Sequence, residues 1–164
     1  MKDKFVILFV CTGNTCRSPM AEGALRALLE KERPGKFEVV SAGTASAVGF
    51  PPTMYAIEAS RIWDVDITGH LSQPLSTSLV DRADLILAMT PQHLKEVLRL
   101  NKDAADKTYL LKNFPDPSPG GESVADPIGQ DLERYNQTFL EIGEYLGKSL
   151  GEIVKKVDEK FDEE

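Results

Sequence analysis

The stretch FVILFVCTGNTCRSP, residues 5–19, joins an apolar run to a short polar loop and then to the start of a helix. Phe5–Val10 is a continuous β-branched and aromatic run, which is typical of a strand buried on both faces. Ser18 can cap a helix, and Pro19 suits the first helical position. The stretch therefore predicts a strand, a loop and a helix in that order.

Strands and helices are expected to alternate along the rest of the chain. Further strands are expected over Phe37–Val40, Ala83–Met89 and Thr108–Leu111. Further helices are expected over 52–63, with Met54, Ile57 and Ile62 on the inner face, over 91–100, and over 131–157 after a loop rich in Pro, Gly and Asp. This alternation predicts an α/β fold of three layers, in which helices cover both faces of a parallel sheet. Ligands bind at the carboxyl ends of strands in such sheets, and residues 11–18 lie at one of these ends.

The spacing Cys-x5-Arg, from Cys11 to Arg17, predicts a site for a tetrahedral anion. Five intervening residues allow a loop to curl round the anion with its backbone N–H groups pointing inward, beside the positive end of the next helix. The Arg17 guanidinium can bind two oxygens at once. We expect this environment to keep Cys11 a thiolate at neutral pH, ready to accept a phosphoryl group, and Ser18 to stabilise the departing thiolate.

Two other interpretations of these residues are open. Cys11 could be a small buried residue at a strand end, with Arg17 a surface charge. Alternatively, a zinc ion could be bound by Cys11, Cys16, His70 and His93. The Cys-x4-Cys spacing is at the edge of the range for zinc, and an arginine beside a metal ion is unfavourable. We therefore expect an anion site with no metal and no cofactor.

Length, charge and cysteine content narrow the class of protein. The 164 residues suit one domain, expected over 1–157, with a charged tail over 158–164 that we expect to be a frayed, solvated helix end. Nineteen basic and 26 acidic residues give a net charge of −7, which argues against a nucleic-acid module. No apolar stretch approaches the roughly 18 residues of a membrane span. The apolar run at 5–10 is short for a secretory signal, and there are two cysteines, so we expect a cytoplasmic protein.

Residues 10–22, VCTGNTCRSPMAE, resemble the active-site signature of the low-molecular-weight protein-tyrosine phosphatases, a family that also contains protein-arginine phosphatases. The resemblance covers essentially the whole chain, because further family segments follow in the expected order. These segments are Ser41-Ala42-Gly43-Thr44, Asp66-Ile67 with His70, Leu87-Ala88-Met89 and Asp126-Pro127. The resemblance implies a four-stranded parallel sheet with a phosphate-binding loop after the first strand.

The resemblance also implies a role for each site residue. Cys11 would be the nucleophile, and Arg17 would bind the phosphoryl oxygens. The other phosphate-binding residues would be Thr12, Gly13, Asn14, Thr15, Cys16 and Ser18. Asn14, Ser18, Ser41 and His70 would form a buried hydrogen-bond network, and Cys16 would protect Cys11 through a reversible disulfide.

The family's general acid is an aspartate of an Asp-Pro pair in the loop before the last helix. Asp116-Pro117 and Asp126-Pro127 both fit this pattern. We choose Asp126 because it leads directly into the expected final helix, whereas Asp116 can be explained as a turn residue. A tyrosine oxygen leaves poorly as an anion, so a proton donor is needed.

The resemblance predicts a monomer that hydrolyses phosphotyrosine in proteins through a phosphocysteine intermediate, with no nucleic-acid or membrane partner. A protein-arginine phosphatase is the alternative, because Thr15 stands where tyrosine-directed members often have Ile or Leu, and residues 87–93 also resemble the arginine-directed branch. Ile128 follows the Asp-Pro pair where an aromatic residue is usual, so ring stacking is not assured. An arsenate reductase, which would need cysteines after Cys16, and a non-catalytic phosphopeptide-binding module are more remote alternatives.

Overall fold

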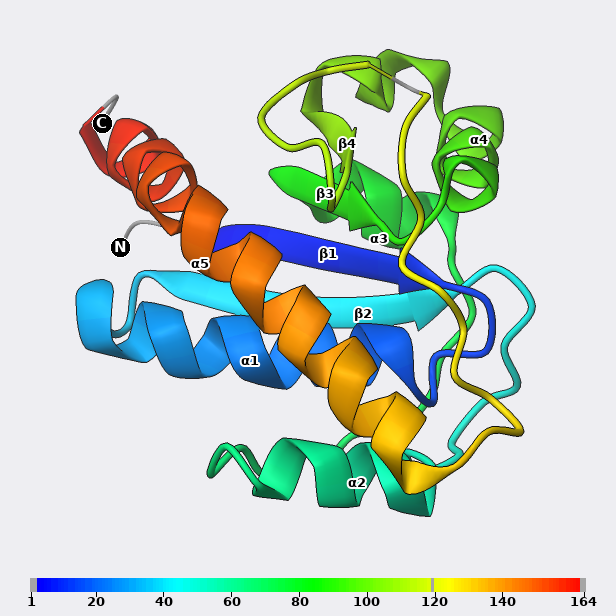
Figure 1. The fold of residues 1–164 in the computed structure, drawn as a ribbon. Helices are drawn as coiled ribbons and strands as arrows, with labels where there is room; N and C mark the ends of the chain where they lie inside the picture. Colours follow the sequence, from blue (N-terminus) through cyan, green and yellow to red (C-terminus); the bar gives the residue numbers. More distant parts are fainter. Residues whose placement is uncertain (1–2, 119, 163–164) are drawn as a thin grey trace.

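Four parallel strands form the centre of the structure, a computed structural model that describes residues 3–118 and 120–162 (Figure 1). They are β1 (Phe5–Cys11), β2 (Phe37–Gly43), β3 (Leu85–Ala88) and β4 (Thr108–Leu110), in the order β2-β1-β3-β4. The register pairs Cys11 at the end of β1 with Gly43 at the end of β2. The four-stranded parallel sheet predicted from the sequence is therefore confirmed, with strand ends that differ by one to three residues.

Helices cover both faces of this sheet, as predicted (Figure 1). They are α1 (Arg17–Glu32), α2 (Met54–Arg61), α3 (Thr77–Arg82), α4 (Pro91–Leu100) and α5 (Leu132–Asp162), with a 3-10 helix over Lys102–Lys107. Helices α1, α2 and α5 pack on one face, and α3 and α4 on the other. The short α3 and the 3-10 helix were not expected from the sequence.

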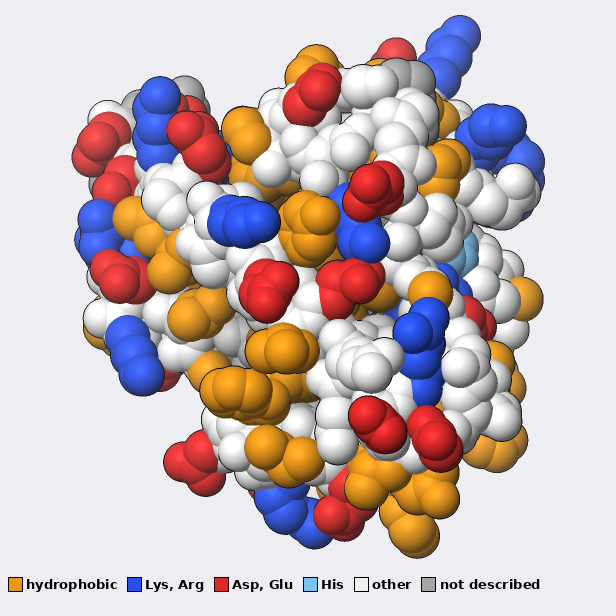
Figure 2. Space-filling model, viewed as in Figure 1, with side chains coloured by type: hydrophobic (Ala, Val, Ile, Leu, Met, Phe, Trp, Pro, Cys, Tyr) orange, Lys and Arg blue, Asp and Glu red, His pale blue; other side chains and the backbone are white. Residues whose placement is uncertain are grey.

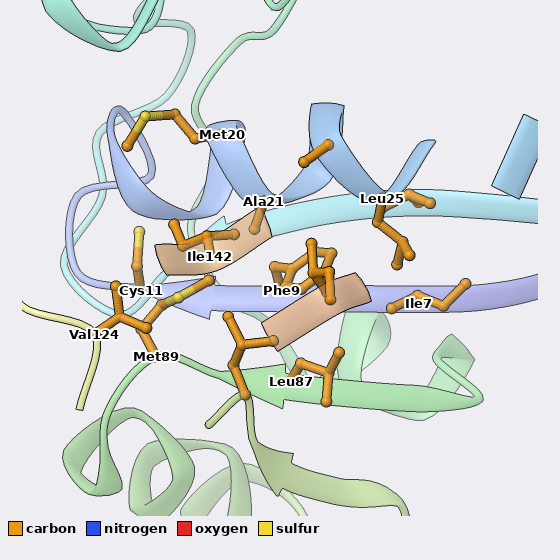
Figure 3. Packing of buried hydrophobic residues seen from close by; sticks show 14 of the residues in the cluster. Ile7, Phe9, Cys11, Met20, Ala21, Leu25, Leu87, Met89, Val124 and Ile142 are labelled. Atoms are coloured by element: carbon orange, nitrogen blue, oxygen red, sulfur yellow. The ribbon is translucent and has the colours of Figure 1, made fainter. Parts of the chain in front are cut away.

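Alternate side chains of β1 enter the two cores. Ile7, Phe9 and Cys11 point toward α1 and α5, where Figure 3 shows Phe9 between Leu25 and Ile142. The intervening side chains of β1 lie in the other core, with residues of α3 and α4. A strand with both faces buried explains the unbroken apolar run at its start. It also holds the end of β1, and therefore the loop that follows it, in a rigid position.

Three local expectations were wrong. The helix α1 is preceded by Cys16 rather than capped by Ser18, whose hydroxyl contacts the Cys11 thiol instead. On α2, Met54 is 75% exposed and Ile62 is 62% exposed. The small residues Ala56, Ala59 and Ser60 face inward there, because α2 packs closely against its neighbours. The last helix does not end at 157 but continues to Asp162.

Residues 158 and 160 are held by ion pairs at this extended end of α5. Asp158 Oδ1 lies 2.7 Å from Arg33 Nε, and Lys160 Nζ lies 2.8 Å from Asp84 Oδ2. The end of the helix is thus tied to the start of the sheet rather than frayed from residue 158 onward. Within the described ranges, none of the helices is both long enough and apolar enough to cross a membrane.

Hydrophobic side chains also gather on the surface where α1, α2 and α5 meet (Figure 2). A groove of about 350 Å³ lies there, with walls that include Leu28, Trp63, Phe139 and Leu140. Charged rim residues are few, with Lys31 and Glu144 among the lining residues. This groove is separate from the polar loop at the carboxyl end of β1.

Candidate active site

The loop between β1 and α1 encloses a pocket of about 210 Å³ at the carboxyl end of the sheet. The pocket is lined by residues 11–17, together with Asp126 and Ile128 from the loop before α5. Two segments that are more than a hundred residues apart in the chain therefore meet at one site. The structure brings together Cys11, Arg17 and Asp126, which the sequence analysis singled out as candidate nucleophile, phosphate-binding residue and acid.

Asn14 organises the loop from a fully buried position. Its φ of 58° is the left-handed region, which Asn tolerates better than most residues. Its Nδ2 donates to Ser18 Oγ at 2.8 Å and to Ser41 Oγ at 2.9 Å, and its Oδ1 accepts from the Gln73 backbone N–H at 2.9 Å. These three hydrogen bonds offset the strain and hold the loop against β2 and the segment after α2.

Glu22 and His70 extend this network behind the loop. Ser41 Oγ donates to Glu22 Oε1 at 2.8 Å, and His70 Nε2 lies 2.8 Å from the carbonyl oxygen of Asn14. Burial acts to raise the pKa of Glu22, but hydrogen bonds from His70, Arg26 and Ser41 outweigh burial and lower that pKa overall. The contacts join Asn14, Ser18, Ser41 and His70 as the resemblance implied. Sequence reasoning missed Glu22, although it lies one helical turn after Ser18 on α1.

Gly43 allows β2 to approach the loop closely. A Cβ at this position would collide with the carbonyl oxygen of Thr12 and come within 2.7 Å of Ser46 Cβ. The backbone N–H of Thr44 donates to the Cys11 carbonyl, and that of Ala45 donates to the Thr12 carbonyl. The glycine therefore serves close packing of backbone against backbone.

The Cys11 thiol is almost completely buried at the base of the pocket. Its Sγ lies 2.8 Å from Ser18 Oγ and accepts a hydrogen bond from the Asn14 backbone N–H at 3.3 Å. Burial raises the pKa of this thiol, and the effect exceeds the lowering by Ser18, by the Arg17 charge and by the Asn14 amide. The expectation of a thiolate at neutral pH is therefore contradicted, because removal of an anion from water outweighs these favourable contacts.

Arg17 is 4% exposed and is held by the loop before α5. Its Nη1 donates to the Val124 carbonyl at 2.9 Å, and its Nη2 lies 3.4 Å from both Thr12 Oγ1 and Asp126 Oδ2. The Asp126 side chain is 41% exposed, so it remains open to a substrate and to water. Nothing in the sequence pointed to Val124, because its contact uses a backbone carbonyl.

The two Asp-Pro pairs are separated by the structure. Asp126 lines the pocket, and its Oδ1 accepts from the Ile128 backbone N–H at 3.1 Å. Asp116 instead accepts from the Ser118 backbone N–H at 2.9 Å, as a turn residue does. Of the two aspartates, Asp126 is the one placed to exchange a proton with a molecule in the pocket.

Cys16 lies on the side of the loop that faces α2 and α5. Its Sγ is 3.4 Å from Tyr135 Oη and 3.5 Å from Thr53 Oγ1. Burial, together with the Cys16 hydrogen bond, raises the pKa of Tyr135 to about 12. Both cysteines are free thiols in the structure.

The four residues considered for zinc do not form one cluster. His70 contacts Asn14 and Glu22, whereas His93 contacts Thr12 and Thr90. Over residues 3–118 and 120–162, no group of three or more His, Cys, Asp or Glu side chains is arranged as a metal site would require.

Comparisons with known proteins agree with this geometry. The family profile described as low molecular weight phosphotyrosine protein phosphatase matches residues 6–161. A protein-arginine-phosphatase of Bacillus subtilis is 39% identical over 151 residues, which cover 92% of this chain and 97% of that protein. A probable low molecular weight protein-tyrosine-phosphatase, EpsP of Ralstonia nicotianae, is 45% identical over 133 residues, covering 81% of this chain and 85% of the relative.

Solved structures from both groups share the fold. A mutant of the YwlE arginine phosphatase with a phosphorylated active-site serine superposes with a TM-score of 0.83 at 37% identity, over 93% of this chain and 97% of that one. A low molecular weight protein tyrosine phosphatase from T. tengcongensis superposes with a TM-score of 0.78 at 35% identity, over 96% and 99% of the two chains.

Proposed function

Because this chain belongs to the low molecular weight phosphotyrosine protein phosphatase family, we propose that it removes phosphate from phosphoarginine in proteins through a phosphocysteine intermediate. Membership of the family makes the chain a hydrolase that acts on phosphorylated proteins. The choice of phosphoarginine over phosphotyrosine is supported by the two relatives named protein-arginine-phosphatase, at 39% and 40% identity. It reverses the order of preference reached from the sequence, where phosphotyrosine came first.

The residues in the walls of the pocket support the choice of phosphoarginine. These walls consist of residues 11–17, Asp126 and Ile128, and the described lining residues include no aromatic ring. Phe50 and Tyr55 are more than 40% exposed and are not among the lining residues. A phenol ring would find no ring to stack on, whereas a guanidinium would find the Thr15 hydroxyl and the carbonyl oxygen of the Asp126 carboxyl group as acceptors for its N–H groups.

The first chemical step transfers the phosphoryl group to Cys11. Sγ attacks phosphorus in line with the P–N bond while the Cys11 proton passes to a phosphoryl oxygen of the substrate. An S–P bond forms, and the P–N electrons remain on the guanidine nitrogen. Asp126 gives that nitrogen a proton as it departs. Arg17 and the loop N–H groups hold the equatorial oxygens, where negative charge accumulates in the transition state.

The second step returns the enzyme to its starting state. Asp126, now ionised, takes a proton from a water molecule that attacks phosphorus on the face the arginine has left. The S–P bond breaks, inorganic phosphate forms, and the proton carried by the phosphoryl oxygen returns to Cys11. Ser18, at 2.8 Å from Sγ, donates a hydrogen bond to the departing thiolate. The same contact helps Cys11 lose its proton in the first step, against the effect of burial on its pKa.

A direct test compares matched peptides that carry phosphoarginine or phosphotyrosine at the same position. We expect kcat/KM to be higher for phosphoarginine, and Thr15→Ile to lower it by removing the hydroxyl acceptor and filling the pocket. Cys11→Ser provides the blank for both substrates. Preference for phosphotyrosine that Thr15→Ile leaves unchanged would refute the substrate assignment while leaving the phosphocysteine mechanism intact.

We also propose a redox response, a cellular location and an oligomeric state. A peroxide can oxidise Cys11 to a sulfenic acid, which condenses with the Cys16 thiol to a disulfide and releases water. The two free thiols support a reducing, cytoplasmic location. We also propose a monomer, which light scattering would test. Mass spectrometry after peroxide treatment of wild type and Cys16→Ser would test the disulfide, whose formation predicts a wild-type species lighter than the reduced protein by two hydrogens and no such species in the variant.

A further inference from the structure

His93 reaches the phosphate-binding loop from the opposite face of the sheet. It lies in the first turn of α4 and is 3% exposed. Its Nε2 is 2.9 Å from Thr12 Oγ1, and its Nδ1 is 3.1 Å from Thr90 Oγ1. The imidazole therefore connects the cap of α4 with the first residue after the nucleophile.

The contact with Thr90 favours a proton on Nε2 of the His93 ring. Thr90 Oγ1 accepts the backbone N–H of His93 at 3.3 Å, as the cap of α4. Nδ1, at 3.1 Å, is the acceptor within reach of the hydroxyl proton of Thr90. Burial and the Arg17 charge, opposed by Asp126, lower the pKa of His93 to about 4, so the ring is neutral near pH 7. A neutral ring whose Nδ1 accepts a hydrogen bond carries its single proton on Nε2.

The Nε2 proton gives Thr12 Oγ1 a second donor. The other donor is Arg17 Nη2 at 3.4 Å, which can only donate. A hydroxyl oxygen accepts two hydrogen bonds, so these neighbours occupy both of its lone pairs. The hydroxyl proton of Thr12 is left for a third group, and Thr12 is among the residues that line the pocket.

We propose that His93, through its Nε2–H, positions the side-chain hydroxyl of Thr12 as a hydrogen-bond donor to the bound phosphoryl group. This inference rests on the proposed function only in requiring that the loop binds a tetrahedral phosphoryl anion. It adds a side-chain donor to the backbone N–H groups and Arg17, and it makes His93 a positioning residue. With the opposite tautomer, Thr12 would donate to His93 and would offer the anion no proton.

The test measures binding of inorganic phosphate by calorimetry, which needs no turnover and no choice of substrate. Thr12→Val keeps the shape of the side chain without its hydroxyl, and we expect it to weaken phosphate binding about tenfold, the usual size for one hydrogen bond to a charged group. Thr12→Ser keeps the hydroxyl and should retain most of the affinity. Thr12→Val that binds phosphate as tightly as wild type would overturn the proposal.

A double-mutant cycle separates positioning from a general loss of packing. His93→Leu, which has no donor, should weaken phosphate binding in the wild-type background but have little further effect in Thr12→Val, because the hydroxyl that His93 positions is then absent. Leu94→Ala is the matched control, since Leu94 is buried on the same helix and packs with Ala88 and Leu110. Equal effects of His93→Leu in both backgrounds would show a structural role and refute the positioning role.

Nitrogen NMR of the imidazole provides an independent readout. The 15N shifts should show a protonated Nε2 and an unprotonated Nδ1 near pH 7, and a ring protonated at Nδ1 instead would overturn the proposal. A failure of the phosphoarginine assignment would alter peptide kinetics but neither of these measurements. The two hypotheses can therefore fail separately.

Discussion

Acidification should destabilise the wild-type protein because His93 gains a proton more easily in the unfolded chain. A variant with a side chain at position 93 that does not titrate should lack this loss of stability. Burial lowers the pKa of the folded imidazole from its usual value of 6.5 to about 4, and the Arg17 charge acts in the same direction, while Asp126 opposes both. Between these two pKa values the unfolded chain binds more protons at His93 than the folded chain does. Stability must therefore fall as the pH falls through this range.

The magnitude follows from the two pKa values. Each unit of difference corresponds to about 1.4 kcal/mol, so the full effect approaches about 3 kcal/mol below pH 4. At about pH 5 the unfolded imidazole is almost fully protonated and the folded one is still mostly neutral. The free energy of unfolding should then be about 2 kcal/mol lower than at about pH 7.5, from this residue alone.

Urea unfolding of wild type and His93→Gln at both pH values measures this difference. Glutamine does not titrate, and every other group is common to the two proteins, so their contributions cancel in the comparison. Wild type should lose about 2 kcal/mol more than the variant on acidification. Equal losses in the two proteins would mean that the folded imidazole is protonated as easily as the unfolded one, and the argument from burial would fail.

Three further predictions concern the loop and its acid. Gly43→Ala should lower kcat by about a hundredfold, because the new Cβ would collide with the Thr12 carbonyl and displace the loop. This is the size expected for a displacement of about 1 Å. A kcat near the wild-type value would contradict the close packing. Ser18→Ala should raise the pKa of the Cys11 thiol further, since it removes a contact that lowers it, and the pH profile of iodoacetamide alkylation would then shift to higher pH. Asp126→Asn should lower kcat/KM, which reports phosphoryl transfer to Cys11, by about a hundredfold or more for phosphoarginine and far less for an aryl phosphate with a good leaving group. A uniform loss of kcat/KM would argue against protonation of the leaving group by this residue.

Local sequence determined much of this site because its parts lie close together in the chain. A buried strand and a short loop with Asn14 and Cys-x5-Arg are fixed by neighbouring residues, and the structure places them as predicted. The following helix is also present, although it begins at Arg17 and is not capped by Ser18. The choice of Asp126 over Asp116 also followed from position, since the loop that enters the final helix is the one that reaches the pocket.

The surroundings of the loop were decided by the tertiary structure. His93, Glu22 and Val124 approach Thr12, Ser41 and Arg17 only after the sheet forms. Each of these three contacts uses a backbone carbonyl or a single hydroxyl, which no spacing in the sequence reveals.

Two expectations failed because they depend on the tertiary structure: which side chains of α2 face inward, and whether the Cys11 thiol is ionised. A hydrophobic pattern predicts large side chains inside, but the buried residues of α2 are the small Ala56, Ala59 and Ser60. Of the three large residues expected inside, Ile57 packs against the core, whereas Met54 and Ile62 are exposed. A sequence shows which charges lie near a thiol along the chain. The pKa of the thiol also depends on how much water the fold removes from around it, and for Cys11 this burial has the larger effect.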